Sequence, residues 1–142
     1  MTMKTRACLY PLEKKHSPNG SVYRALRSTD QDFVGFGEAY FSEIHPNSVK
    51  GWKRHKKMTC NLVVPIGSVG FVVTEDFQNF DEFYLSNDCY ARLVIGPLVW
   101  FAFKGLSRET SLLLNVADLV HDACEHEIRE FDSKPYKWKR NN

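Results

Sequence analysis

Short apolar runs separated by polar turn signals recur along most of this 142-residue chain. Runs such as 69–73 and 90–95 end directly at polar or turn-forming residues. This pattern is typical of all-β sandwiches and barrels, because each short strand crosses the core and then reverses at a turn. It predicts strands within residues 21–26, 37–44, 56–65, 69–73, 83–85, 90–95, 99–103 and 111–115.

The length suits one domain over residues 1–142, large enough to bury a core. We expect a small β-barrel of about eight or more short strands. The tail from residue 118 onward is first acidic and then basic. There we expect one short helix near residues 124–131, followed by irregular structure.

One cationic segment, Lys50 to Lys57, interrupts this pattern at the mouth of the apolar run 61–67. If the segment is a strand, alternate side chains share a face, so Lys53 and His55 point the same way. An unpaired cation on the inner face of a barrel is costly and needs a reason. The usual reason is a site for an anionic or proton-exchanging ligand. The competing interpretation of His55 is a surface histidine beside a basic loop.

Composition narrows the possible functions. The chain is 43% hydrophobic and 13% aromatic, which is typical of a globular protein. A formal net charge of +2 is too small to indicate a nucleic-acid partner. No run approaches the roughly 18 apolar residues of a membrane span. The start of the chain carries Lys4 and Arg6 without a signal-peptide core, and the four cysteines lie far apart, so we expect free thiols in the cytoplasm.

Two signatures of the cupin jelly-roll barrels can be laid on this sequence in register. The first, G-x5-H-x-H-x3–4-E-x6-G, falls on Lys53, His55, Cys60 and Gly67. The second, P-x-G-x2-H-x3-N, falls on Gly96, Leu98, Phe101 and Gly105. The spacing of the first signature is kept, whereas most identities of the second are lost.

The substitutions within these signatures argue against a metal. A metal-binding cupin needs histidines and a carboxylate, but Lys53 places an ammonium where a ligand should stand and Phe101 has no lone pair. We therefore predict no metal and no cofactor, and an acid–base or binding barrel.

Wider stretches make the chain similar to the metal-free cupins that act on nucleotide-linked 4-keto-6-deoxy sugars. These are the dTDP-4-dehydrorhamnose 3,5-epimerases and the sugar 3,4-ketoisomerases, a group also called WxcM-like. The similar stretches lie within about residues 16–138: 17–21, Tyr40, 49–57, 95–100, 111–115, and His121, Asp122 and Glu125. The resemblance implies a dTDP-sugar ligand, a role in surface-polysaccharide synthesis, and a homodimer in which an N-terminal strand completes the neighbour's sheet.

The resemblance also implies roles for single residues. Lys50 stands where the family's arginine contacts the diphosphate, and Lys53 stands where the family has its base histidine. His55 matches the second histidine of the ketoisomerases, and Phe101 replaces a later family histidine. Three accounts follow: Lys53 is the base; His55 is the base while Lys53 steadies the enolate; or the barrel binds a sugar nucleotide or a protein partner without catalysis.

Five further residues are candidates for the site. Tyr40 stands where the ketoisomerases keep a tyrosine near the sugar, or is an ordinary aromatic core residue. If Arg92 faces inward, it can reach a diphosphate. If it faces outward, it is simply a polar residue in the alternating apolar and polar pattern of the strand. Trp52 stacks on a base or packs in the core. Asn61 is a further candidate for substrate binding. His121 belongs to the site's rim, or caps the expected C-terminal helix together with Asp122.

Overall fold

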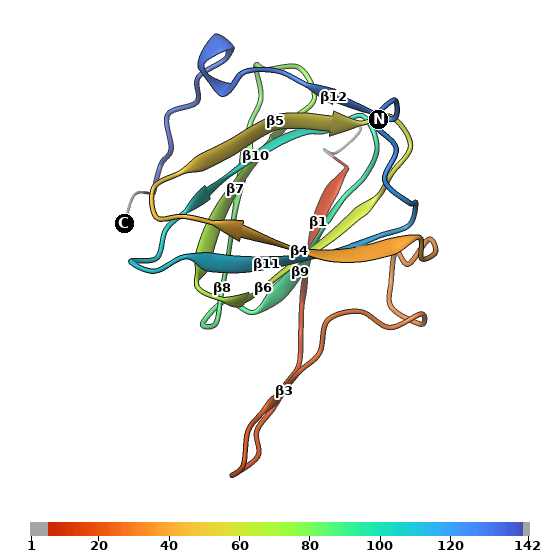
Figure 1. Cartoon of the computed structure of the whole chain (residues 1–142), viewed down its shortest axis with the longest axis vertical. Coiled ribbons are helices and arrows are strands. Elements are labelled where there is room, and N and C mark those ends of the chain that lie inside the picture. Colours follow the sequence, from red (N-terminus) through yellow and green to blue (C-terminus); the bar gives the residue numbers. More distant parts are fainter. Residues whose placement is uncertain (1–5, 141–142) are drawn as a thin grey trace.

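Two five-stranded antiparallel sheets face each other in this computed structural model, which describes residues 6–140 (Figure 1). Lys4 and the two ends of the chain lie outside the described residues. The first sheet has the order β1 (Ala7–Pro11), β9 (Ala91–Ile95), β6 (Cys60–Ile66), β11 (Ser111–Ala117) and β4 (Glu38–Ile44). The second has the order β12 (His126–Ile128), β5 (Val49–His55), β10 (Trp100–Gly105), β7 (Ser68–Thr74) and β8 (Asp81–Ser86). This is the jelly-roll barrel expected of a cupin.

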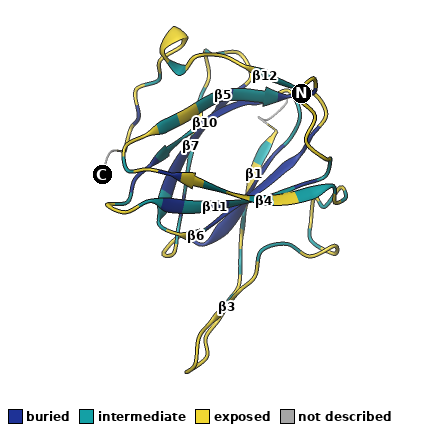
Figure 2. Cartoon of the chain, in the orientation of Figure 1, coloured by how far each residue is buried: buried dark blue, intermediate teal, exposed yellow. Residues whose placement is uncertain are grey.

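The main core lies between the two sheets, where the strands are darkest in Figure 2. Alternate residues of each strand point into it, including Leu62 and Val64 of β6 and Leu93 of β9. Phe71 of β7 meets them from the second sheet. Burial of these apolar side chains is the main favourable term that holds the sheets together.

A second core covers the outer face of the second sheet. Its buried members are Trp52, Val72, Trp100, Ala102 and Trp138. The tail supplies the cover, because Phe131, Tyr136 and Trp138 pack on this face and the Trp52 indole Nε1 donates to the Lys134 carbonyl at 2.9 Å. The irregular tail is thus a packed part of the domain.

Most expected strands are confirmed within a few residues, and the differences have physical reasons. The helix expected near residues 124–131 is wrong: β12 pairs with the edge of β5, and only a short 3-10 turn, Phe131–Ser133, follows. Strand pairing overrides helix propensity there. Strand β1 was missed. Of the range 21–26 only β3 (Val22–Tyr23) is a strand, paired with β2 (Lys14–Lys15) in a hairpin that projects from the body (Figure 1).

No helix within residues 6–140 is long and apolar enough to cross a membrane.

Candidate functional site

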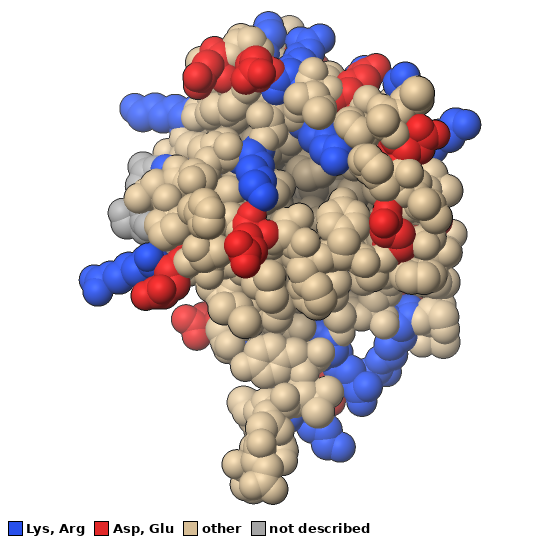
Figure 3. All heavy atoms as spheres, viewed as in Figure 1, with Lys and Arg blue, Asp and Glu red and all other residues tan. Residues whose placement is uncertain are grey.

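A pocket of about 190 Å³ opens between the sheets. Strands of both sheets line it with Tyr40, Ser42, Lys50, Gly51, Lys53, His55, Leu62, Phe101, Phe103, Leu113 and Asn115. The space-filling view shows a hollow in this face of the barrel with cationic side chains near its rim (Figure 3). The candidates Lys50, Lys53, His55 and Tyr40 therefore converge on one cavity.

Strand β5 carries three of these residues, and a β-bulge decides which face they occupy. Lys53 lies opposite Phe101 on β10, but Gly51 lies opposite Ala102, so Trp52 is an extra residue in the ladder. Lys53 and His55 face the pocket, as strand alternation predicts. Beyond the bulge the alternation shifts by one residue, so that Lys50 joins them on the pocket side.

Gly51 makes this bulge possible. Its φ of +133° lies in a region that residues with a side chain rarely adopt. An added Cβ would also lie 2.5 Å from the Ala102 Cβ, closer than real contacts permit. The placement of Lys50 thus depends on a glycine next to it.

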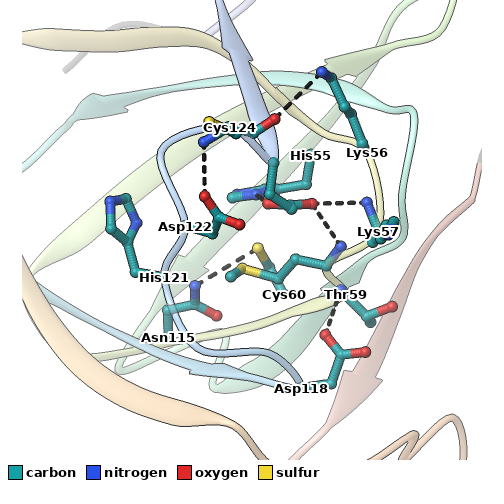
Figure 4. A network of polar contacts seen from close by, with 12 residues as sticks. His55, Lys56, Lys57, Thr59, Cys60, Asn115, Asp118, His121, Asp122 and Cys124 are labelled. Atoms are coloured by element: carbon teal, nitrogen blue, oxygen red, sulfur yellow. Dashed lines mark hydrogen bonds and ion pairs between the residues drawn. The ribbon is translucent and has the colours of Figure 1, made fainter.

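His55 forms a buried pair with Glu125, from the loop that leads into β12. The His55 Nδ1 lies 2.6 Å from the Glu125 Oε1, and the His55 residue is only 3% exposed. The other carboxylate oxygen accepts the backbone N–H groups of Lys57 and Met58 at 2.7 and 2.8 Å (Figure 4). With Nδ1 held by the carboxylate, the remaining ring nitrogen, Nε2, is the one available for proton transfer.

The surroundings shift the pKa of both partners of this pair. Burial lowers the pKa of His55, assisted by the charge of Lys53, although the bond to Glu125 works in the opposite direction. Burial alone would raise the pKa of Glu125, but the hydrogen bonds from Lys57, His55 and Met58 outweigh it and hold that pKa at about 2. The pair therefore combines a neutral imidazole with an ionised carboxylate at neutral pH.

Lys53 is a cation without a partner in the described part of the chain. Among residues 6–140 its ammonium makes no hydrogen bond or ion pair, although it lines the pocket beside His55. The ring of Phe101 stands across the ladder from it and stacks near the His55 ring, with 6.3 Å between ring centroids. An unpaired ammonium beside an apolar ring favours an anionic ligand or a developing negative charge.

The same residues do not fit a divalent metal. Lys53 repels cations, Phe101 offers no ligand atom, and the His55 Nδ1 is already held by Glu125. The thiol of Cys60 is buried in the main core and is not part of the pocket lining, and burial raises its pKa to about 12. Residues 6–140 contain no group of three His, Cys, Asp or Glu side chains placed to hold a metal ion.

Tyr40 points into the pocket from β4 and is fixed by Asn115. The Asn115 side-chain nitrogen donates to the Tyr40 hydroxyl at 2.9 Å, while the Asn115 oxygen accepts the Asn61 N–H at 3.2 Å. Because its oxygen accepts this bond, the Tyr40 hydroxyl keeps its own proton for a ligand. Burial raises the pKa of Tyr40, which keeps it a proton donor.

Three of the proposed binding residues lie outside the pocket lining. Trp52 is fully buried in the second core. Arg92 faces away from the main core, is 1% exposed, and donates to the Asn61 side-chain oxygen at 2.6 Å and the Gln31 carbonyl at 2.8 Å. The outward alternative for Arg92 is thus the one observed, and Asn61 serves as its partner.

His121 lies at the rim of the site. It lines a groove of about 360 Å³ with Glu38, Tyr40 and Lys53, so this groove shares two residues with the pocket. Its backbone N–H donates to the Glu38 carboxylate at 2.7 Å. It caps no helix, because the expected helix is absent from this part of the structure.

Two residues of this site, Glu125 and Asn115, were not predicted to act in it. Both belong to stretches that resemble the sugar-nucleotide cupins, and that was the only signal in the sequence. Their partners, His55 and Tyr40, are 70 and 75 positions away. A single sequence does not reveal pairings at that separation.

No protein-family model matches the chain, and no curated protein matches it. Among solved structures, a dTDP sugar isomerase from Desulfovibrio desulfuricans G20 is 32% identical, with a TM-score of 0.89 over 96% of this chain and 92% of that one. A mutant 3,4-ketoisomerase QdtA from Thermoanaerobacterium thermosaccharolyticum, in complex with TDP-4-keto-6-deoxyglucose, is 23% identical, with a TM-score of 0.76 over 93% of both chains.

The 4-keto-6-deoxy sugar epimerase NovW from Streptomyces spheroides is 12% identical, with a TM-score of 0.80 over 95% of this chain and 75% of that one. The last two likenesses show the fold. The likeness to the Desulfovibrio isomerase extends to the sequence over nearly the full length of both chains. The chain belongs to the cupin family that comprises the dTDP-sugar 3,4-ketoisomerases and epimerases.

Proposed function

We propose that this protein is a sugar-nucleotide isomerase that moves a proton next to the ketone of a dTDP-linked 4-keto-6-deoxyhexose, with His55 as the base. The observation that carries the proposal is the buried His55–Glu125 pair, which opens into the same pocket as Lys53 and Tyr40. The family of the Desulfovibrio isomerase supports the substrate class.

The first step removes a proton from the carbon beside the ketone. The neutral His55 takes it on Nε2, and the electron pair of the broken C–H bond moves onto the ketone oxygen as an enolate. Glu125 keeps the ring oriented and stabilises the imidazolium that forms. The lowered pKa of His55 keeps this base unprotonated at neutral pH.

The enolate oxygen then needs a positive or hydrogen-bonding partner. Lys53 supplies a charge that no carboxylate of the described residues neutralises, and Tyr40 supplies a hydroxyl proton. Return of a proton to the same carbon from the opposite face gives an epimer. To shift the ketone, the sugar hydroxyl on the deprotonated carbon gives up its proton, the former ketone oxygen gains one, and a proton is added to the former ketone carbon, so that the deprotonated carbon becomes the new ketone.

Phe101 limits which groups return the proton. It occupies the place of the later family histidine, and a phenyl ring carries no exchangeable proton. Tyr40, protonated His55 and the Lys53 ammonium are groups in the pocket lining that can return a proton. This is also the observation that favours a second candidate, a barrel that binds a sugar nucleotide without turning it over.

Lys50 is proposed to hold the diphosphate. It lies on the pocket side of the bulge and its ammonium donates to the Glu43 carbonyl at 2.6 Å, which fixes one end of the chain while two donors stay free. Lysine meets a phosphate as a point charge rather than as a bidentate fork.

The biological setting is proposed on the same family basis. We place the reaction in the cytoplasm, in the supply of modified sugars for a surface polysaccharide. We also propose a homodimer; the projecting hairpin of β2 and β3 is consistent with it, because an isolated two-stranded ribbon is marginally stable.

Solvent exchange tests the function directly. The protein is incubated with dTDP-4-keto-6-deoxyglucose in heavy water, and the sugar is followed by NMR and mass spectrometry. We expect deuterium beside the ketone with the wild type and a loss on the order of 10²–10⁴-fold with His55→Ala. With Lys53→Ala we expect slower exchange that is still measurable.

The other outcomes assign the site differently. Exchange that survives in His55→Ala but not in Lys53→Ala makes Lys53 the base. Tight binding of the nucleotide sugar without any exchange in the wild type makes the protein a binding barrel, and the isomerase proposal fails.

A further inference from the structure

Three imidazoles form a row from the buried pair to the surface. The ring of His126 lies 6.1 Å from that of His55, edge to face at 65°, and 5.4 Å from that of His121. Exposure rises along the row: His55 is buried, His126 is partly buried, and His121 is exposed. Neither His126 nor His121 has a task in the reaction described above.

The strand pairing holds the first contact in place. His126 of β12 is the direct antiparallel partner of His55 of β5, so both side chains lie on the same face of the sheet. The His126 Nδ1 is buried and has no hydrogen-bond partner among residues 6–140. A buried, unpaired ring nitrogen is unusual, and it is free to exchange a proton with a bridging water or with its neighbour.

The chemistry of the site creates a need for such a group. After it has taken a proton, His55 must lose it before it can act as a base again. Glu125 is a poor acceptor because its carboxylate already accepts two backbone N–H groups, which hold its pKa at about 2. A sugar in the pocket would also cover the side from which water reaches His55, which is only 3% exposed.

We propose that His126 and His121 form a proton relay that connects His55 with the solvent behind the bound sugar; this proposal rests on the proposed isomerase function. The proton passes from His55 to His126, from His126 to His121, and from there to a buffer base, with a water bridging the ring nitrogens where they do not meet. Each imidazole gives up one proton as it receives one, so no other reactant is required. His126 and His121 act through His55 and are therefore positioning residues for this transfer.

The relay is tested with His126→Phe, which keeps an aromatic ring without nitrogen, and with His126→Gln as the second variant. His45→Phe is the matched control, because His45 is an exposed histidine whose ring bonds Thr110 outside the pocket lining. In dilute buffer we expect turnover and solvent exchange of His126→Phe to fall by about tenfold or more, as for a lost proton-transfer group. Added imidazole should restore the rate of this variant and leave the wild type and His45→Phe unchanged.

A readout without substrate separates the relay from the function. In ligand-free protein, at a pH low enough to protonate His55, NMR measures how long the His55 Nε2 proton persists before it exchanges with water, and we expect a longer lifetime in both His126 variants than in the wild type. Wild-type turnover and proton lifetime in both variants would overturn the relay. So would a slowed turnover that imidazole does not rescue combined with an unchanged lifetime. If the wild type shows no exchange into the sugar, the isomerase proposal fails, and the lifetimes alone decide the relay.

Discussion

The two faces of β5 have opposite chemistry although their residues alternate along one strand. Towards the pocket the strand presents Lys53 and His55, and towards the tail it presents Trp52 and Arg54. Arg54 has a partner on both sides, because its Nε and Nη2 donate to the Glu127 carboxylate and its guanidinium lies 4.7 Å from the Trp100 ring centroid. Lys53, one position away, has no such partner among the described residues.

This contrast separates a structural cation from a functional one. The charge of Arg54 is neutralised by a carboxylate of the protein itself. The inner face leaves an ammonium unsatisfied beside a base that the protein has oriented, and a ligand can complete it. The number of cations in the segment says little about function; the partner of each cation decides it.

The largest effect on stability is expected when Trp52, the large residue on the outer face, is replaced. Trp52→Ala should lower the free energy of unfolding by about 3–5 kcal/mol, because it leaves a cavity between the sheet and the tail and removes the bond to the Lys134 carbonyl. Lys53→Ala, its neighbour on the inner face, should change stability by less than about 1 kcal/mol. Urea denaturation followed by circular dichroism measures both, and equal losses would contradict the division between the faces.

The bulge that turns Lys50 to the pocket side can be disrupted by a substitution at Gly51. Gly51→Ala should cost about 1–3 kcal/mol of stability, because of the positive φ and the close approach to Ala102. It should also raise KM for the nucleotide sugar more than it lowers kcat, since Lys50 leaves the pocket face. Steady-state kinetics and denaturation of the same variant test both effects, and an unchanged KM would show that the bulge does not position Lys50.

A smaller effect is expected when Lys50 itself is changed. Lys50→Gln should weaken dTDP binding by about tenfold, or ~1.4 kcal/mol, and reduce the salt dependence of binding. Lys56→Gln is the control, because the Lys56 ammonium contacts the Cys124 carbonyl outside the pocket lining. Calorimetric titration with dTDP would refute the assignment if both variants bind alike.

The last prediction concerns the pH dependence of stability. Glu125 has a folded-state pKa of about 2 against an ordinary 4.5, so its contribution to stability is full above pH 4.5 and is lost as the pH falls towards 2. The lowered pKa of His55 acts in the same direction, because the unfolded chain takes up this proton first as the pH falls through 6.5. In Glu125→Gln the melting temperature should decline less between pH 4.5 and 2 than in the wild type. Glu75→Gln, on an exposed loop, should keep the wild-type profile, and equal slopes in all three proteins would refute the role of the pair.

Much of the barrel could be predicted because apolar alternation is a local signal. The shared face of Lys53 and His55 followed from it directly. The placement of Lys50 did not, since a bulge shifts the alternation by one residue and simple counting would put Lys50 with Trp52. The family resemblance, not the alternation, indicated Lys50.

Other features depend on contacts between distant segments. The direction of Arg92 could not be decided until the neighbours of β9 were known, and the structure places it outside the main core with Asn61. The local sequence of β12 predicts a helix, because its pairing with β5 is a tertiary contact that the local sequence does not show. The role of Glu125 could not be predicted for the same reason, since its contact with His55 joins distant parts of the chain.

The separation of His55 and Glu125 also has a consequence for how the molecule is made. The two residues are 70 positions apart, and between them lie the strands that build most of both sheets. Contacts over such distances make β-sandwich folding slow, because chain entropy must be lost before they form. A nascent chain that has released β5 but not yet β12 therefore carries an unoriented histidine, an open sheet edge and an uncovered Trp52. Exposed apolar surface and an unpaired strand edge promote aggregation until the tail arrives.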